Sequence, residues 1–310
     1  MKYSLRQIEV FVAVARLGRV SHAADAVALS QSAASTALSE FEGQFDCRLF
    51  ERVGKRLQIN TLGEQLLPKA VELLDRAAEI EALLEGRTGL GALRIGATLT
   101  IGNYLATLIV ADFLQQHPEA KVQLKVHNTA TIVEQVAGYE LDLGLIEGSC
   151  RHPDLVTQPW VRDELVVFAA PDHPLVRRRT VPVETLMRER WILREQGSGT
   201  REVFEQALRP FHVEATLMIR LELEHTEAIK RAVESGLGIG CISRLALREA
   251  FRRGSLAPIA TPSLDLTRRF QFLWHRDKYH TAVLREFLTA CQTLSAGAER
   301  SDLIELPEIP

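Results

Sequence analysis

The chain opens with segments whose apolar residues recur at helical spacing. Residues 5–15 carry an apolar side chain at every third or fourth position, which predicts an amphipathic helix. The segment 21–45 predicts two further helices joined by a tight turn, with Ser21 and Ser30 as their N-cap residues. Three short helices in succession, the second and third joined by a turn, indicate a helix-turn-helix unit.

The helix predicted at 31–45 has two distinct faces. At about 100° per residue, its apolar face carries Ala34, Ala37, Leu38, Phe41 and Phe45. An apolar back packs on a partner helix, and a front of small polar groups leaves base edges accessible in the major groove. A plain surface helix is the alternative reading. The residues expected to face DNA are Ser30, Gln31, Ser32, Ser35, Thr36 and Ser39.

Residues 50–59 predict a β-hairpin with Gly54 at its turn. Arg52, Lys55 and Arg56 lie near the tip of this hairpin. A basic hairpin beside a recognition helix is typical of a wing that contacts the phosphate backbone. The three basic residues are therefore added to the expected DNA-binding set.

Three motifs carry a family resemblance: LRQIEVF at 5–11, SQSAAS at 30–35 and LFERVGKR at 49–56. With them, residues 1–61 resemble the winged helix-turn-helix of LysR-type transcriptional regulators, and the resemblance extends over essentially the whole chain. It implies a sequence-specific DNA-binding transcription factor. Ser32 stands where the family commonly has proline, and Thr36 where it has a longer, often basic side chain. These departures concern which base pairs are read.

A long helix is predicted from Thr61, which with Glu64 fits a capping box, to about residue 85, with a slight bend at Pro68. A core stripe within one domain would give the same pattern over three heptads. A dimerising linker is favoured because the helix lies between the predicted DNA-binding head and a glycine-rich hinge at 86–91. Its apolar positions follow the spacing of a coiled-coil seam: Leu62, Leu66, Ala70, Leu73, Ala77, Ile80 and Leu84.

From residue 92 onward, predicted strands alternate with predicted helices, which indicates parallel sheets in two α/β halves. The family resemblance implies a two-lobed effector domain at 92–296, similar to periplasmic solute-binding proteins, with crossover strands near 162–168 and 266–274. We expect domains as follows: head 1–61, linker and hinge 62–91, lobe I at about 92–162 and 267–296, lobe II at about 163–266, and a flexible acidic tail at 297–310.

Ligands of such sheets bind beyond the carboxyl ends of the strands. Two strand-to-helix turns, one in each half, offer hydroxyls beside free backbone N–H groups, a combination that favours an anion. Ordinary capping loops are the alternative reading. A carboxylate at the same place needs a donor from a loop or from a protonated ligand. The expected effector-binding residues are Thr98, Thr100, Glu147, Gly197, Ser198, Gly199 and Thr200.

We therefore expect a small oxyanion as effector, and an oxyanion that carries a proton is the more specific form of this hypothesis. The sequence resembles the sulfur- and sulfite-responsive branch of the LysR family, which implies sulfite or another sulfur oxyanion. The oligomer is expected to be a homodimer or homotetramer, and RNA polymerase is a candidate protein partner.

Charge agrees with a small DNA-binding surface. The whole chain has a formal net charge of −3, but residues 1–60 carry 8 Lys and Arg against 6 Asp and Glu, or +2. The four cysteines are widely spaced and match no metal-binding or redox motif. We expect no cofactor, no metal, no membrane association and a cytoplasmic location.

Two alternative functions remain. An α/β enzyme with an accessory helical head is disfavoured because no catalytic constellation is found. A cytoplasmic solute receptor is disfavoured by the head itself.

Overall fold

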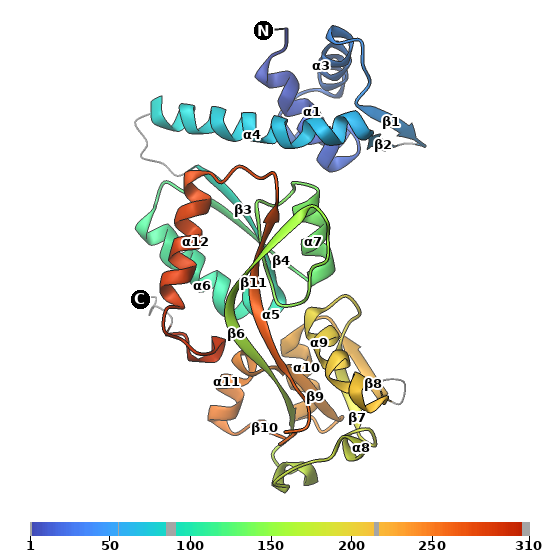
Figure 1. Ribbon diagram of the computed structural model, residues 1–310, viewed down its shortest axis with the longest axis vertical. Helices are drawn as coiled ribbons and strands as arrows, with labels where there is room; N and C mark the ends of the chain where they lie inside the picture. Colours follow the sequence, from blue (N-terminus) through green and yellow to red (C-terminus); the bar gives the residue numbers. More distant parts are fainter. Residues whose placement is uncertain (1, 55, 85–90, 214–216, 306–310) are drawn as a thin grey trace.

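The computed structural model describes residues 2–54, 56–84, 91–213 and 217–305. Three parts follow one another along its long axis: a helical head, a first lobe and a second lobe (Figure 1). In the described residues, no helix combines the length and the apolar character needed to cross a membrane.

The head packs its helices and hairpin around one apolar cluster that includes Phe11, Phe41 and Phe50. Its first helix begins with a capping box between Ser4 and Gln7. The elements are α1 (Leu5–Leu17), α2 (Val20–Ala26), α3 (Gln31–Gln44), β1 (Phe50–Val53) and β2 (Arg56–Ile59).

Two of the sequence expectations for the head need correction. Ser21 lies inside α2, whose N-cap is Arg19, so Ser21 does not cap that helix. Phe45 follows the last residue of α3 and is 48% exposed, because the helix ends before it can return to the core. The N-cap prediction for Ser30 is confirmed, since its Oγ accepts a hydrogen bond from the Ala33 amide at 3.2 Å.

The linker helix α4 (Thr61–Leu84) runs without interruption past Pro68. Its first turn is capped by Asn60, whose Oδ1 accepts a hydrogen bond from the Gly63 amide at 2.9 Å. Thr61 already belongs to the helix, so the predicted capping box beginning at Thr61 is wrong. Most of the predicted hinge, residues 85–90, lies outside the described residues.

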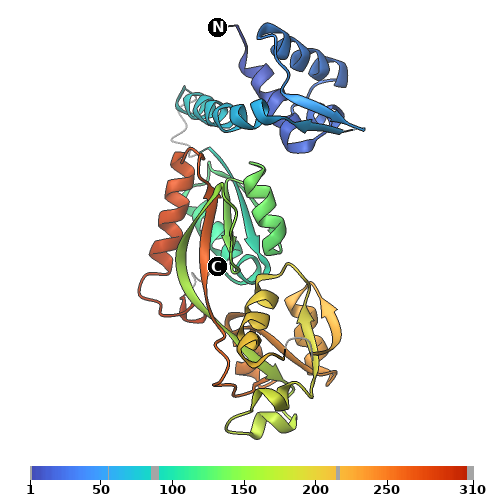
Figure 2. The same ribbon diagram turned by 45° about the vertical axis from the view of Figure 1, so that its right-hand side comes forward.

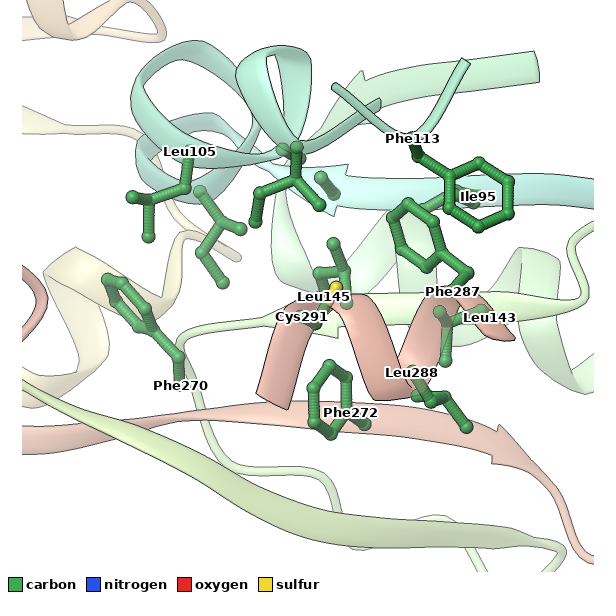
Figure 3. Packing of buried hydrophobic residues seen from close by; sticks show 14 of the residues in the cluster. Ile95, Leu105, Phe113, Leu143, Leu145, Phe270, Phe272, Phe287, Leu288 and Cys291 are labelled. Carbon is green, nitrogen blue, oxygen red and sulfur yellow. The ribbon is translucent and has the colours of Figure 1, made fainter. Parts of the chain in front are cut away.

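Lobe I is a sheet in the order β4-β3-β5-β11-β6. Helices α6 and α12 cover one face and α7 the other (Figures 1 and 2). On the α12 side, Phe113, Leu145, Phe272 and Phe287 pack in the core (Figure 3). The elements are β3 (Ala92–Thr98), α5 (Leu99–Ile101), η1 (Gly102–Ala106), α6 (Thr107–Gln116), β4 (Lys121–His127), α7 (Thr129–Ala137), β5 (Leu143–Ile146) and α12 (Ala282–Leu294).

Two long strands pass between the lobes: β6 (Leu155–Ala169) and β11 (Thr267–His275). Both crossovers were predicted. The predicted parallel pairing is confirmed for the strands that alternate with helices within each lobe, but not for the crossover strands. β6 and β11 pair antiparallel with each other, β11 pairs antiparallel with β5, and β6 pairs antiparallel with β9. The two strands connect lobes directly instead of alternating with covering helices, so the parallel rule does not apply to them.

Lobe II continues the sheet in the order β6-β9-β7-β8. Its helix α11, which the sequence analysis missed, is capped by Ser243, whose Oγ accepts from the Leu245 amide. The elements are η2 (Pro174–Arg177), α8 (Val183–Leu186), β7 (Arg190–Arg194), α9 (Gly199–Leu208), η3 (Arg209–Phe211), β8 (Met218–Leu223), α10 (Thr226–Glu234), β9 (Ile239–Ser243), α11 (Arg244–Arg253) and β10 (Ala257–Pro258).

The segment after α12 corrects the expectation of a flexible tail. Residues 301–303 form a short 3-10 helix, η5 (Ser301–Leu303). The Ser301 side chain is completely buried and Ile304 is 3% exposed, within the core of lobe I. Burial of an apolar side chain gives this segment a fixed place that its acidic composition did not suggest.

Candidate functional site

Helix α3 exposes the polar face that the sequence predicted. Its core-facing residues Ala34, Leu38 and Phe41 are at most 6% exposed. The predicted DNA-facing side chains are all exposed: Ser30, Gln31, Ser32, Ser35, Thr36 and Ser39. The apolar face of α3 thus packs on the head, and its polar face is exposed, as in a helix that enters the major groove.

The hairpin β1–β2 stands beside this helix as a wing. Val53 pairs with Arg56, and Gly54 at the turn has a φ of +62°, which glycine adopts without strain. Arg52 and Arg56 are exposed, whereas Lys55 lies outside the described residues. The wing is fastened to the end of α1 by a hydrogen bond from the Leu57 amide to the Gly18 carbonyl, 2.9 Å.

An apolar groove runs between the head and α4. It has a volume of about 510 Å³ and is lined almost wholly by carbon, including Tyr3, Phe45, Leu62 and Leu66. Further along the seam, Ile80 is 59% exposed. Of the predicted coiled-coil positions, Leu66, Ala70 and Leu73 pack with the core of the head, whereas Leu62, Ile80 and Leu84 are exposed.

A buried polar cluster joins the two lobes. Thr200, in α9 of lobe II, donates its hydroxyl hydrogen to Glu147 Oε1 at 3.1 Å, just beyond β5 of lobe I. Arg268, on β11, donates from Nη1 to Thr200 Oγ1 at 3.1 Å and lies 3.5 Å from Glu147 Oε2 through Nη2. All three residues are at most 8% exposed.

Asp163, on β6, holds the Arg268 guanidinium from the other side. Arg268 Nε donates to Asp163 Oδ2 at 2.7 Å, and the Asp163 carboxylate also accepts hydrogen bonds from the hydroxyls of Ser243 and Ser301. Burial lowers the pKa of Arg268, but the charges of Glu147 and Asp163 outweigh it and raise that pKa above its ordinary value. The guanidinium is therefore a permanent cation at the boundary of the lobes.

The turn before α9 makes the other contacts between the lobes. The Gly199 amide donates to Thr129 Oγ1 at 3.2 Å. A Cβ on Gly199 would lie 2.6 Å from the backbone nitrogen of Gly148, so only glycine permits this approach. Gly197 has a φ of +84°, and its carbonyl accepts from the Ala130 amide. The N-terminus of α7 therefore meets the 197–200 turn.

The predicted effector residues fall in three places. Thr98 and Thr100 are buried in lobe I, and Thr98 donates to the Leu145 carbonyl at 3.3 Å. Glu147 lines a cavity of about 530 Å³ that also includes Arg268. The second cavity, of about 370 Å³ beyond the Gly148–Gly199 contact, is lined in part by Gly197, Ser198, Thr129 and Cys150. That Thr98 and Thr100 face the 197–200 turn stays a prediction.

Several buried polar atoms around this boundary make no hydrogen bond with the described residues. They are Glu147 Oε2, Arg268 Nη2 and Ser198 Oγ. Buried polar groups in native proteins are almost always satisfied by protein, water or ligand. These atoms make the boundary between the lobes the candidate place for a small polar ligand.

Sequence reasoning missed Arg268, Asp163 and Thr129. The available signal was weak: Arg268 and Asp163 each interrupt a segment predicted as a strand, but no spacing relates one to the other. They are 105 positions apart and become neighbours only through the pairing of β6 with β11.

Two family profiles match the chain. Residues 5–64 match the bacterial regulatory helix-turn-helix protein of the lysR family, and residues 87–296 match the LysR substrate binding domain. The HTH-type transcriptional regulator YeiE of Escherichia coli is 43% identical over 94% of this chain and 98% of its own length.

Solved structures show the same architecture. The regulatory domain of CcmR from Synechocystis, in complex with 2-PG, has a TM-score of 0.63 and 30% identity over 67% of this chain and 99% of its own. A full-length OxyR variant from Pseudomonas aeruginosa has a TM-score of 0.72 and 19% identity, with complete coverage of both chains. The chain belongs to the LysR family of transcriptional regulators and joins a helix-turn-helix DNA-binding domain to a two-lobed effector-binding domain.

Proposed function

We propose that the protein binds operator DNA through residues 1–61 and that its binding to that DNA changes when a small anion binds between the two lobes. The observation that carries the effector part is the buried cluster of Glu147, Thr200 and Arg268, which spans both lobes and the crossover strand. It supports a ligand-sensitive closure, because any molecule that enters here must break and replace contacts that hold the lobes together.

On DNA, α3 supplies base contacts and the wing supplies phosphate contacts. The exposed front of α3 carries hydroxyls and Gln31 but no arginine or lysine, so its direct contacts to base edges are few. Arg52, Lys55 and Arg56 at the wing are the proposed phosphate-contacting residues. Specificity then depends in part on DNA shape and on two heads held at a fixed spacing.

We propose a homodimer, or a tetramer built from dimers, with α4 as its dimerisation element. The apolar groove beside α4 and the exposed Ile80 support this proposal, because a second copy of the same helix offers the matching apolar seam. A symmetric pair of heads would then meet an operator with two half-sites.

For the effector, we propose an oxyanion small enough for these cavities. Ser198 Oγ is a buried hydroxyl without a hydrogen-bond partner among the described residues, and an anion oxygen would supply an acceptor. Arg268 Nη2 faces Glu147 Oε2 as an ion pair at 3.5 Å without a hydrogen bond, so an anion oxygen could also take its place. Glu147 Oε2 is an acceptor that likewise lacks a hydrogen-bond donor there, and a ligand hydroxyl would supply it. A singly protonated oxyanion such as hydrogen sulfite has both groups, whereas a fully ionised anion leaves Glu147 facing like charge.

A second ligand is suggested by the CcmR regulatory domain, which was solved with 2-PG. At 30% identity this neighbour makes 2-PG a sensible probe for the same boundary in this chain. We place it after the small oxyanion, because each of the two cavities offers only a few unsatisfied polar atoms.

The experiment is a calorimetric titration of the full-length protein with sulfite, sulfate, 2-PG and small carboxylates at constant ionic strength. A gel shift with the promoter region upstream of its own coding sequence follows, with and without each binder. We expect sulfite to bind, and Thr200→Val to weaken it about tenfold, the usual effect of removing one hydrogen bond to a charged group. No binding by any probe would overturn the anion proposal, and no shifted promoter fragment at low salt would overturn the operator proposal.

A further inference from the structure

The head lies next to lobe I (Figures 1 and 2). Another polar cavity, outside the effector region, is lined by residues of both parts. It has a volume of about 790 Å³ and is lined by α1 and α2 of the head and by β3 and β4 of lobe I. That volume is within the range of small-molecule sites. Its charged lining residues are Arg6, Glu9, Arg16, Arg94, Lys125 and Glu140.

Most of the charges behind this cavity are already paired. Arg94 donates to both carboxylate oxygens of Asp142, at 3.0 and 2.7 Å. Lys278 bridges Asp142 and Asp75 of the linker helix, at 2.8 and 2.5 Å. These two cations and two carboxylates neutralise one another and fasten the head to lobe I.

Arg6 is likewise paired with Glu9 on the next turn of α1, at 2.7 Å. Two cations of the lining remain. Within the described part of the chain, the side chains of Arg16 and Lys125 make no hydrogen bond or ion pair, and Arg16 Nε is fully buried without an acceptor.

The environment of Arg16 is unfavourable for a lone cation. Burial and then the nearby charge of Arg94 lower its pKa to about 10, despite the carboxylates of Asp142, Asp75 and Glu140. A desolvated guanidinium is normally paired with a carboxylate or a phosphate. Among the described lining residues, Glu140 is the one unpaired carboxylate, against two unpaired cations.

From this geometry we propose that the cavity between the head and lobe I binds a small molecule bearing a phosphate group, held by Arg16 from the head and Lys125 from lobe I. The guanidinium offers two parallel N–H donors to phosphate oxygens, and the ammonium adds a point charge from the opposite wall.

The consequence is regulatory. A ligand that contacts both the head and lobe I binds only when the two parts are docked, and therefore stabilises that docked arrangement. The DNA-binding head would thus respond to two ligands at separate sites, one between the lobes and one at its own base.

The test uses the full-length protein and sodium pyrophosphate, with inorganic phosphate as the smaller probe, in buffer whose ionic strength is held constant with chloride. Calorimetric titration measures the dissociation constant of wild type, Arg16→Gln and Lys125→Met. Lys121→Met is the matched control, because Lys121 is exposed on the same strand as Lys125. Thr200→Val controls for binding between the lobes.

We expect wild type to bind pyrophosphate, with Arg16→Gln and Lys125→Met each weakening it about tenfold or more. Both controls should bind as wild type does. If Arg16→Gln fails to fold, Lys125→Met decides the question alone. Arg16→Gln and Lys125→Met should bind sulfite as wild type does. The effector proposal and this one can therefore fail independently of each other.

Three results would overturn the proposal. The first is that wild type binds neither probe. The second is that pyrophosphate binding is abolished in Thr200→Val but kept in Lys125→Met, which places the binding between the lobes. The third is that a non-specific DNA duplex displaces pyrophosphate and that Lys125→Met reduces the salt dependence of DNA binding. The last result would assign the cavity to a DNA phosphate.

Discussion

Glu147 and Arg268 place their charged groups 3.5 Å apart at the boundary between the lobes, with side chains 1% and 3% exposed. Few positions in the molecule combine so much burial with full charge. The pair depends on Asp163 and Thr200 for its remaining hydrogen bonds, and two of its atoms have no hydrogen-bond partner among the described residues. It is at once a structural contact and the strongest candidate for a ligand contact.

Replacing Arg268 with glutamine should destabilise the protein by about 3–5 kcal/mol, because Asp163 and Glu147 are left as buried, unpaired carboxylates. Urea unfolding of the full chain measures the change. Arg269→Gln is the matched control, since Arg269 is the next residue on β11 and is exposed. Equal stability of the two variants would contradict the assigned role of Arg268.

On DNA, Arg52→Ala or Arg56→Ala should weaken binding to all sequences and reduce the slope of log affinity against log salt by about 0.9 for each phosphate that the wing no longer neutralises. Gln31→Ala or Ser35→Ala should instead reduce discrimination between operator and mismatched sites by about 1–3 kcal/mol for each base that α3 no longer reads. Fluorescence anisotropy over a salt series separates the two. Arg179→Ala, exposed in lobe II, is the control. Identical behaviour of both classes would show that helix and wing were wrongly assigned.

Ile80→Lys should shift the protein toward a smaller assembly, because a charge would enter the proposed apolar seam of α4. Sedimentation velocity at several concentrations measures the assembly state. Glu81→Lys changes charge at the adjacent exposed position without altering the seam. If Ile80→Lys assembles as wild type does, α4 is not the dimerisation element.

Two of the four thiols should react with a disulfide reagent in the native protein and all four after unfolding. Cys241 and Cys291 are at most 2% exposed, and burial raises the pKa of each thiol, so the reactive thiolate is scarce. Cys47 and Cys150 are half-buried. Because Cys150 lines the smaller cavity between the lobes, effector should slow its labelling and leave Cys47 unchanged. Rapid native labelling of four thiols would contradict the structure.

Asp142→Asn should lower stability at pH 7 by about 3 kcal/mol and weaken the fall in stability on acidification. Burial by itself raises the pKa of Asp142, but the hydrogen bonds and charges of Arg94 and Lys278 outweigh it and hold that pKa below the ordinary value. A depressed carboxyl pKa contributes stability above the unfolded value, near 4, and loses it as the pH falls toward the folded value. The difference between wild type and variant should therefore shrink between about pH 5 and 3, as measured by urea unfolding. A difference independent of pH would rule out this linkage.

The local periodicity of the chain determined much of the architecture. The two faces of α3, the cap at Ser30, the position and length of α4 and the order of strands and helices all follow from neighbours within a few positions, where helical and extended spacing differ. The predictions were wrong where two neighbouring residues could each cap a helix, as at Asn60 and Thr61. They were also wrong where burial against residues distant in the sequence fixes a polar segment, as at 301–304.

The tertiary structure alone decided the sites. Arg268 reaches Asp163 because β11 pairs with β6, and Arg16 and Lys125 share a cavity because the head docks on lobe I. Neither pairing leaves a periodic signal, since single charged residues more than a hundred positions apart are brought together only by strand register and domain packing. The sequence determined which residues form the exposed polar face of α3, because helical periodicity is local. The folded structure decided where the protein holds its buried charges, because strand register and domain packing bring distant residues together.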